Sequence, residues 1–277
     1  MNNRTQENKL IDIEKVFIDK NPGLFKLIPK PIIKYLKNII HQDELNEFID
    51  SSKDQKGIAF VERVFSHLFP IEIKHKGLEK IPADGRYMFI SNHPLGGLDG
   101  LAFILAASEK FENIKFPVND ILMNLEGLKE IFIPINKHGG YSKESARIFE
   151  KAIVSDCQIL YFPAGLVSRK IKGEIIDVAW KSSFLKKAIS SKRDIVPVHI
   201  SGRNRDFFYN LAKFRSFLGI KANIEMLYLP NEMFKFQSKE IVINFGTPIP
   251  YKSINSDLTI SEWVLKIREQ SYALANE

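Results

Sequence analysis

A change in hydropathy pattern near residue 71 constrains the fold more than any other feature of this chain. From Ile71 onward, short apolar runs that suit strands alternate with longer segments whose apolar residues recur at helical spacing. Helices of this kind are the usual crossovers between parallel strands. The alternation predicts an α/β fold with a mixed, mostly parallel sheet flanked by helices. We expect strands at 71–75, 87–91, 114–118, 131–135, 157–162, 195–200 and 241–245, and helices at 98–109, 143–155, 178–190, 206–217 and 261–275.

The first 70 residues lack this alternation and favour helices, interrupted by Pro22-Gly23 and further prolines. We therefore predict an N-terminal helical segment over 1–70 and an α/β domain over 71–277. Within the first part, the stretch from Leu24 to Ile40 mixes large apolar side chains with lysines. Such a stretch is able to bury its apolar side in a lipid headgroup layer. Packing of that side on the main domain is the alternative, and the pattern fits both.

Charge and cysteine content limit the classes of partner. The chain of 277 residues is 44% hydrophobic, which suffices for a large core, and its formal net charge of +7 favours an anionic partner: a phospholipid surface, an acidic carrier protein or nucleic acid. The single cysteine, Cys157, excludes an internal disulfide and a cysteine-based metal site. No stretch approaches 18 uncharged apolar residues, so we expect a soluble or peripheral protein without a membrane-spanning helix.

A glycine turn directly after an apolar strand carries a histidine and an aspartate. The stretch is Ser91-Asn92-His93-Pro94-Leu95-Gly96-Gly97-Leu98-Asp99-Gly100. A histidine titrates near neutral pH and takes a proton from a hydroxyl when a carboxylate holds its ring in the right tautomer. Residues six apart on one continuous helix point to different faces, so His93 and Asp99 meet only if Gly96 and Gly97 fold the chain back. The pair is a candidate catalytic dyad, and a structural hydrogen bond is the alternative.

A second stretch of the same form runs from Ile159 to Lys170. An apolar strand ends in a turn that contains Gly165, and two cations, Arg169 and Lys170, follow. A guanidinium fork at a strand end suits a carboxylate or a phosphate. Arg169 and Lys170 are alternatively read as part of a solvated basic loop, which is where such cations usually occur. Only the order along the chain of this turn and the His93 turn favours a binding site.

Four blocks in this order resemble the glycerolphosphate and lysophosphatidate acyltransferase family. They are Asn92-His93 through Asp99, Ile131 through Asn136, Phe162 through Arg169, and Val196-Pro197-Val198-His199-Ile200. The blocks lie within roughly residues 70 to 250 of the chain. In this family the histidine is the general base and the aspartate its partner. The resemblance implies that His93 deprotonates an acceptor hydroxyl and that Asp99 orients His93, with Gly165 in the substrate-binding block.

The resemblance also implies the partners of the reaction. The acyl group comes from the thioester of acyl-carrier protein or acyl-CoA, the acceptor is a lyso-lipid, and neither a metal nor a bound cofactor is needed. The carbonyl oxygen becomes negative in the tetrahedral state, and the backbone N–H groups of Gly96 and Gly97 are candidates to stabilise it. We expect a peripheral enzyme on the cytoplasmic face of the cell membrane, bound to an anionic surface and not to nucleic acid.

Three departures from the family pattern bear on the acceptor. Five residues separate His93 from Asp99 where the family has four, the third block lacks its usual acid, and the second offers Lys137 in place of an arginine. The residues of the first and third blocks resemble those of a hemolysin-like Bacteroidetes branch of this family. Some members of that branch are similar to the O-acyltransferases that esterify the 3-hydroxyl of N-(3-hydroxyacyl) glycine or ornithine lipids. That resemblance implies a lyso-amino-acid lipid as acceptor, with Arg169 or Lys170 at its carboxylate.

Three alternatives remain open. A 1-acylglycerol-3-phosphate acyltransferase would perform the same chemistry on a phosphate-bearing acceptor. A lysophospholipase or thioesterase would use the dyad with water, although the chain lacks the Gly-x-Ser-x-Gly elbow of serine hydrolases. A non-catalytic membrane-binding protein would leave His93 without a role. For the acyltransferase we expect an apolar tunnel from His93 toward residues 24–40, because the acyl chain arrives from lipid.

Overall fold

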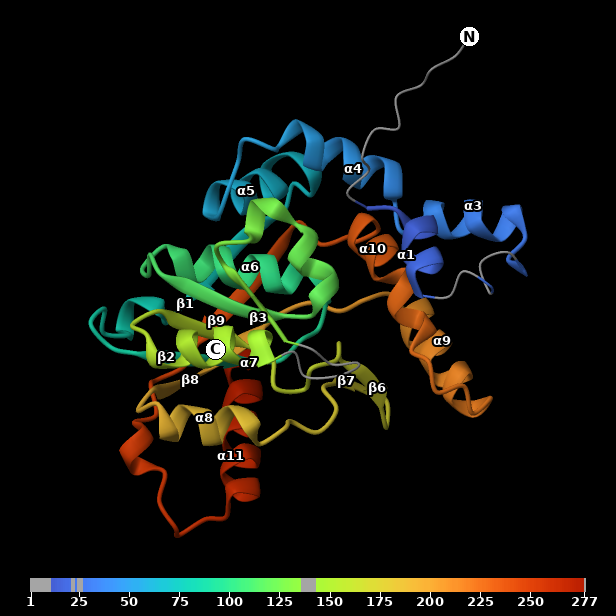
Figure 1. Cartoon of the computed structure of the whole chain (residues 1–277). Coiled ribbons are helices and arrows are strands. Elements are labelled where there is room, and N and C mark those ends of the chain that lie inside the picture. Colours follow the sequence, from blue (N-terminus) through green and yellow to red (C-terminus); the bar gives the residue numbers. More distant parts are fainter. Residues whose placement is uncertain (1–10, 21–22, 24–26, 136–142, 277) are drawn as a thin grey trace.

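The computed structural model describes residues 11–20, 23, 27–135 and 143–276. Its main element is a seven-stranded sheet in the order β1-β9-β8-β2-β5-β3-β4, flanked by helices (Figure 1). Neighbouring strands are parallel except β8 and β9, so the predicted mixed, mostly parallel sheet is confirmed. The strands, including a separate β6–β7 pair, are β1 (Glu72–Lys76), β2 (Tyr87–Ser91), β3 (Ile114–Val118), β4 (Phe132–Pro134), β5 (Gln158–Tyr161), β6 (Arg169–Ile171), β7 (Glu174–Ile176), β8 (Asp194–Ile200) and β9 (Glu240–Phe245).

Helices precede the sheet and connect its strands. The α-helices are α1 (Ile13–Lys20), α3 (Lys30–Ile39), α4 (Gln42–Ser51), α5 (Ile58–Arg63), α6 (Gly97–Ser108), α7 (Lys143–Val154), α8 (Ser183–Ser190), α9 (Asp206–Phe217), α10 (Leu229–Phe234) and α11 (Ile260–Ala273). The shorter helical turns are η1 (Val64–Leu68), η2 (Leu78–Lys80), η3 (Asp120–Asn124), η4 (Glu126–Leu128), η5 (Ile224–Tyr228), η6 (Tyr251–Ser253) and η7 (Leu274–Asn276). Within the described ranges, no helix combines the length and the apolar character that crossing a bilayer requires.

Strand β2 lies at the centre of the sheet, and all five of its residues are buried. It pairs in parallel with β8 on one side and with β5 on the other, so that Ile90 lies opposite Pro197 and Tyr161. The carboxyl ends of β8, β2 and β5 therefore lie at one edge of the sheet. The first, third and fourth sequence blocks follow or end these strands, which is how residues far apart in sequence reach one place.

Helices cover both faces of the sheet, and alternate residues of β2 face the two layers. Phe89 belongs to a buried cluster with residues of α5 and α6. Met88 and Ile90 belong to another cluster, with residues of α7, α8 and α11. Because β2 is buried on both faces, its run from Tyr87 to Ile90 is continuously apolar rather than alternating.

Arg193, which immediately precedes β8, is a cation with no solvent exposure. Its guanidinium donates hydrogen bonds at the end of α7 and at the starts of β2 and β5. Burial lowers the pKa of Arg193, while the carbonyl groups at the end of α7 form the negative end of the helix dipole and favour a cation there. The acceptors are the carbonyl oxygens of Tyr87, Ala152, Ile153, Ser155 and Cys157.

The helical character predicted for the first 70 residues is confirmed in the described part. Phe48, Phe60 and Val64 share a buried cluster with the sheet, so α4, α5 and η1 pack on the α/β domain. On α3, Ile32 and Tyr35 are 48% and 50% exposed. One part of the N-terminal segment is therefore core, and α3 keeps an apolar side in solvent. The division at residue 70 stays a prediction.

Two features near the carboxyl edge of the sheet were not predicted. Strands β6 and β7 form an antiparallel hairpin after β5. The helix expected at 178–190 begins only at Ser183, because two hydrogen bonds hold the preceding residues in a loop. Trp180 Nε1 donates to Asp177 Oδ2 (2.9 Å), and the Lys181 N–H donates to Pro163 O (3.1 Å). This loop lies against the turn that follows β5.

Candidate active site

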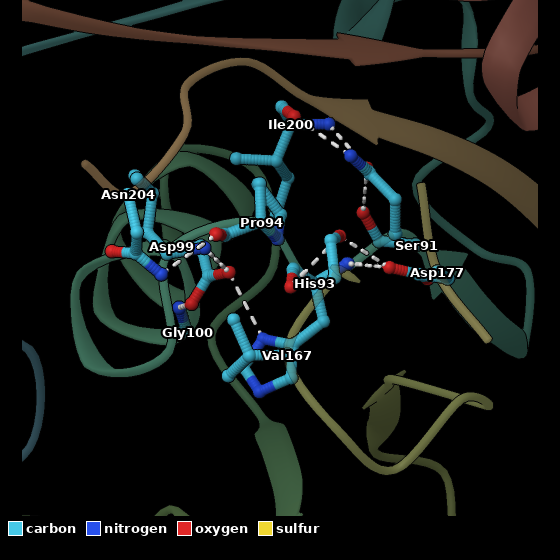
Figure 2. Close-up of polar contacts among 12 residues, drawn as sticks. Ser91, His93, Pro94, Asp99, Gly100, Val167, Asp177, Ile200 and Asn204 are labelled. Carbon is cyan, nitrogen blue, oxygen red and sulfur yellow. Dashed lines mark hydrogen bonds and ion pairs between the residues drawn. The ribbon is translucent and has the colours of Figure 1, made fainter. Parts of the chain in front are cut away.

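His93 and Asp99, the predicted dyad, are in contact. His93 follows β2, Asp99 lies in the first turn of α6, and His93 Nδ1 is 2.9 Å from Asp99 Oδ2 (Figure 2). Gly96, with φ of 90°, reverses the chain between them in a conformation that other residues rarely adopt. The turn thus accommodates the five residues between the histidine and the aspartate.

Asp99 is fully buried and accepts hydrogen bonds from three donors. Besides His93 Nδ1, the Leu95 N–H donates to Oδ2 (2.8 Å) and the Gly100 N–H donates to Oδ1 (2.9 Å). Because a carboxylate only accepts, this arrangement assigns the imidazole proton to Nδ1 and leaves a lone pair on Nε2. The His93 side chain retains 16% exposure. The geometry is that of a general base with a buried orienting carboxylate.

The chain that follows β5 holds both the ring and the backbone of His93. The Phe162 ring stacks on the imidazole, with centroids 4.1 Å apart and an angle of 18° between the rings. The Ser168 N–H donates to His93 O (2.8 Å), and the His93 N–H donates to Asp177 Oδ1 (3.2 Å). The first and third sequence blocks therefore form one site.

Asn92 joins the first block to the fourth. Its Oδ1 accepts from the Ile200 N–H (2.8 Å) and its Nδ2 donates to Ile200 O (2.9 Å), so the side-chain amide replaces a backbone partner at the end of β8. Beyond β8, Asn204 Nδ2 donates to Pro94 O (3.2 Å). Figure 2 shows these contacts on both sides of the turn. They fix the backbone before and after His93.

The amino end of α6 lies against α10. Gly96 is the N-cap of α6, and no side chain caps this helix. A Cβ at Gly96 would lie 3.0 Å from Leu229 Cδ1, and a Cβ at Gly97 would lie 2.7 Å from Met233 Sδ. Gly96 needs glycine because of its positive φ, whereas a Cβ at Gly97 would displace the Met233 thioether. Amide groups at an uncapped helix start suit an oxyanion, and the stabilising role assigned to Gly96 and Gly97 stays a prediction.

Arg169 does reach the site region, but its charge is already paired. Its Nη2 lies 2.9 Å from Oε1 of the fully buried Glu225, whose Oε2 accepts from Arg215 Nε (2.8 Å). Arg169 Nη1 donates to Val167 O (2.6 Å). Burial lowers the pKa of Arg169, and Glu225 opposes that effect. The guanidinium fork is thus committed to protein groups, and substrate binding by Arg169 stays a prediction.

The other predicted binding residues occupy different environments. Lys170, on β6, is 44% exposed at its side chain, and its Nζ lies 3.7 Å from Asp206. Gly165 has φ of 64° and closes the turn after β5, where its N–H donates to Phe162 O (3.1 Å). Lys137 lies outside the described residues. Among these groups, Lys170 offers the most accessible positive charge near the third block.

Sequence reasoning missed Asp177, Ser168 and Glu225. A signal exists for Asp177, because it interrupts the apolar run Ile175-Ile176-Asp177-Val178-Ala179-Trp180, where a carboxylate is costly unless it is hydrogen-bonded. No comparable pattern marks Glu225, whose neighbours are those of an ordinary helical segment. Its burial follows only from the tertiary position of the two arginines.

The predicted apolar tunnel from His93 toward the lysine-rich N-terminal stretch stays a prediction. Two open hollows of about 410 Å³ each lie in the described chain, one against α11 and one beside the loop after β8, and His93 lines neither. The two regions are nevertheless connected by packing. Tyr35 of α3 is 2.8 Å from the Tyr228 hydroxyl, and the following residue, Leu229, lies against Gly96.

A mostly parallel α/β sheet with a histidine–aspartate pair after its central strand is the architecture expected from the four sequence blocks, and the comparison with known families agrees. The chain belongs to the acyltransferase family, whose model matches residues 15–277. The predicted family membership and acyltransferase activity are thereby confirmed.

Two similar curated proteins are each named lyso-glycine lipid O-acyltransferase. The protein from Bacteroides thetaiotaomicron is 45% identical over 266 residues, which cover 96% of this chain and 97% of that protein. The protein from Phocaeicola vulgatus is 44% identical over 266 residues, covering 96% and 95%. A crystal structure of the 1-acyl-sn-glycerophosphate acyltransferase PlsC from Thermotoga maritima matches with a TM-score of 0.50 and 16% identity, over 95% of this chain and 91% of that one. The latter likeness shows the fold alone.

Proposed function

We propose that this acyltransferase moves a fatty acyl group from a thioester to the hydroxyl of a lyso-glycine lipid. The observation that carries the proposal is the His93–Asp99 dyad, with Nδ1 to Oδ2 at 2.9 Å, in a chain 45% identical over nearly its whole length to a lyso-glycine lipid O-acyltransferase. The dyad supplies the chemistry, and the relatives supply the acceptor class.

In the proposed reaction, His93 Nε2 takes the proton of the acceptor hydroxyl as its oxygen attacks the thioester carbonyl carbon. Asp99 stabilises the imidazolium that forms. The N–H groups of Gly96 and Gly97 stabilise the negative oxygen of the tetrahedral intermediate. When the intermediate collapses, the carbon–sulfur bond breaks and the imidazolium returns its proton to the departing thiolate. The products are the ester and a free thiol, and no bound metal or cofactor takes part.

The glycine headgroup of the proposed acceptor ends in a carboxylate. We assign its recognition to Lys170, because its side chain is 44% exposed and its pair with the exposed Asp206 is long (3.7 Å), whereas Arg169 is held at 2.9 Å by the buried Glu225. Lys137, from the second block, is the other proposed contact. A 1-acylglycerol-3-phosphate acceptor is the alternative within the same chemistry. The acyl donor is acyl-carrier protein or acyl-CoA, both of which are anionic and suit a chain with a net charge of +7.

We further propose that the enzyme binds the cytoplasmic face of the cell membrane as a peripheral protein, through an exposed apolar surface. Figure 1 shows α3 and α9 on the same side of the molecule, and the Tyr35–Tyr228 contact joins α3 to η5. Exposed lysines accompany the apolar groups at 30, 34, 213 and 221, so the surface suits anionic headgroups. The apolar surface comprises Leu27, Ile32, Tyr35, Phe207, Phe214, Phe217, Leu218, Ile220, Ile224 and Leu227.

The acceptor is tested by the lipid profile of cells that lack the protein, complemented with wild type or with His93→Ala. We expect a lyso-glycine lipid to accumulate and only the wild type to remove it. Accumulation of lysophosphatidate would establish the alternative acceptor. Rescue by His93→Ala would refute the catalytic role of the dyad. Purified enzyme with a synthetic acceptor and each thioester then identifies the donor, and release of free fatty acid in place of ester would indicate a hydrolase.

The membrane surface is tested by flotation with vesicles of phosphatidylglycerol or of phosphatidylcholine alone. Phe214 and Phe217 are 59% and 85% exposed, so Phe214→Ser with Phe217→Ser should abolish binding to the anionic vesicles without lowering Tm. The matched control is Leu265→Ser on α11, an equally apolar group that is 54% exposed outside the apolar surface. Equal binding by both variants would show that the apolar surface is not used.

A further inference from the structure

A second buried carboxylate contacts the proposed general base, and no step of the proposed reaction uses it. Asp177 lies between β7 and α8, 84 residues from His93 in sequence, and is 2% exposed. Its Oδ1 accepts from the His93 N–H (3.2 Å) and from Ser168 Oγ (2.6 Å). Its Oδ2 accepts from Trp180 Nε1 (2.9 Å). Figure 2 shows Asp177 and Asp99 on opposite sides of His93.

The backbone of Asp177 is itself held by α11. The Asp177 N–H donates to the Tyr272 hydroxyl (2.8 Å), and Arg268 Nη2 donates to Asp177 O (3.1 Å). The carboxylate is therefore carried on a support that packs on the sheet, and not on a freely moving loop. A group held at its main chain and at both carboxylate oxygens is able to transmit that position to His93.

Both backbone polar groups of His93, its N–H and its C=O, are hydrogen-bonded. Its N–H is bonded to Asp177, and its C=O accepts from the Ser168 N–H (2.8 Å). Ser168 closes the arrangement, because its Oγ donates to the same Asp177 oxygen that accepts from His93. Asp99 contacts the imidazole, whereas Asp177 and Ser168 contact the backbone. The two carboxylates thus control different parts of one residue.

Burying a carboxylate costs free energy, which interactions or a role in function must offset. Burial raises the pKa of Asp177, and the Ser168 and Trp180 hydrogen bonds oppose the rise. Ser168 and Asp177 both lie in the chain after β5, so the segment that contains the substrate-binding block is tied directly to the catalytic turn. The residue whose backbone Asp177 and Ser168 both contact is His93, the proposed base, and this location points to a role in catalysis.

We propose that Asp177 is a positioning residue for acyl transfer: together with Ser168 it fixes the main chain of His93 and so aims Nε2 at the acceptor hydroxyl. The proposal rests on His93 being the general base. Because small misplacements of a reacting group cost large factors in rate, loss of Asp177 lowers kcat more than it weakens acceptor binding.

The test is Asp177→Ala combined with Trp180→Phe. The alanine removes the oxygen that accepts from the His93 N–H and Ser168 Oγ, and the phenylalanine removes the indole N–H that would otherwise lose its acceptor. We expect kcat to fall between about 10- and 100-fold, with KM for the lyso-lipid changed by no more than about threefold. Asp194→Ala is the matched control, since Asp194 accepts the Tyr251 N–H at the opposite end of β8, and it should leave kcat unchanged.

The pH profile separates positioning from a general loss of structure. The charged or titratable groups that hydrogen-bond to His93 or Asp177 within the described chain are Asp99 from α6 and Tyr272 and Arg268 from α11. Removing the Asp177 charge disfavours the imidazolium, so the acid limb of kcat/KM should move to lower pH. A lower Tm alone would not move this limb.

Ser168→Ala decides the question if the double variant does not fold, because it keeps the carboxylate and removes only the contacts of Ser168 Oγ with Asp177 Oδ1 and His93 O. A fall in kcat at constant KM supports positioning. Wild-type kcat in Ser168→Ala, or in a folded double variant whose acid limb is unmoved, would overturn the proposal. His93→Ala in the same assay distinguishes the failures: an active His93→Ala refutes the proposed base, whereas an inactive one with normal Asp177 and Ser168 variants refutes the positioning role alone.

Discussion

Replacing Asp99 by asparagine tests the dyad at the atom where its geometry is most constrained. Asp99 Oδ2 accepts from His93 Nδ1 and the Leu95 N–H, and Oδ1 accepts from the Gly100 N–H. An amide has one oxygen, so either orientation sets its NH₂ group against a buried backbone N–H. If the NH₂ group replaces Oδ2, it also faces His93 Nδ1, which must then become an acceptor. The imidazole proton moves to Nε2, and the base is lost.

The magnitudes follow from these contacts. One buried N–H is left without an acceptor, which costs about 1–3 kcal/mol of stability. Either orientation loses the charge that stabilises the imidazolium, and the orientation with NH₂ at Oδ2 also loses the correct tautomer; general-base catalysis of this kind is worth about 10²- to 10⁴-fold in kcat. We expect Asp99→Asn to fold with a lowered Tm and to lose activity by at least the smaller of these factors.

The assay measures ester formed from an acyl thioester and a lyso-glycine lipid, under conditions where Tm shows the variant to be folded. Asp194→Asn serves as the control, because it also removes a carboxylate that accepts a backbone N–H, but at the far end of β8. A kcat for Asp99→Asn within about tenfold of wild type would refute the proposed tautomer control. His93 would then act without an orienting carboxylate, or would not be the base.

Burial lowers the pKa of His199 from 6.5 to about 4, so the unfolded chain binds a proton there at a higher pH than the folded protein does. Stability that is present above pH 6.5 is lost as the pH falls toward 4, by about 2 kcal/mol between pH 7 and pH 5. In denaturant titrations, the free energy of unfolding of His199→Gln should therefore fall by about 2 kcal/mol less than that of the wild type over this range. An equal pH dependence of the two proteins would contradict the lowered pKa of His199. Gly97→Ala places a Cβ 2.7 Å from Met233 Sδ and should lower the stability of the wild type by about 1 kcal/mol. In a Met233→Ala background the same substitution should cost less, because the clashing sulfur is gone. Arg169→Gln should lower Tm, because it removes one partner of the buried Glu225 carboxylate. Lys170→Gln should leave Tm unchanged and raise KM for the lyso-glycine lipid. A raised KM in Arg169→Gln, with a normal KM in Lys170→Gln, would reassign the headgroup contact to Arg169.

The strands were predictable because each one is a short apolar run with turn residues at its end. The predicted bounds of β2, 87–91, agree with the structure at both ends. The α/β class was predicted from the alternation of such runs with helices. The start of α8 was predicted too early, because the apolar residues from Val178 to Trp180 continue the helical pattern of Phe184 and Leu185. Tertiary hydrogen bonds from Trp180 and Lys181 prevail over that local pattern.

The site was predictable where its chemistry is local. His93 and Asp99 lie in one turn, so residue types and glycines sufficed to pair them. Asp177 contacts His93 from 84 residues away, and Glu225 pairs with Arg169 from 56 residues away. Such contacts depend on the order of the strands and on the hairpin after β5. For that reason the charge of Arg169 was predicted to be free for substrate, whereas the fold places a buried carboxylate on it.

The Arg193 guanidinium has a consequence for the order in which this protein is built. Its carbonyl acceptors come from residues 87 to 157, all of which leave the ribosome before Arg193 does. Until that side chain arrives, the carbonyl oxygens of Tyr87, Ser155 and Cys157 lack the guanidinium as a donor, and water must hydrate them. A nascent chain that ends before residue 193 therefore lacks both β8 and this donor, and the amino ends of β2 and β5 stay hydrated until Arg193 is added.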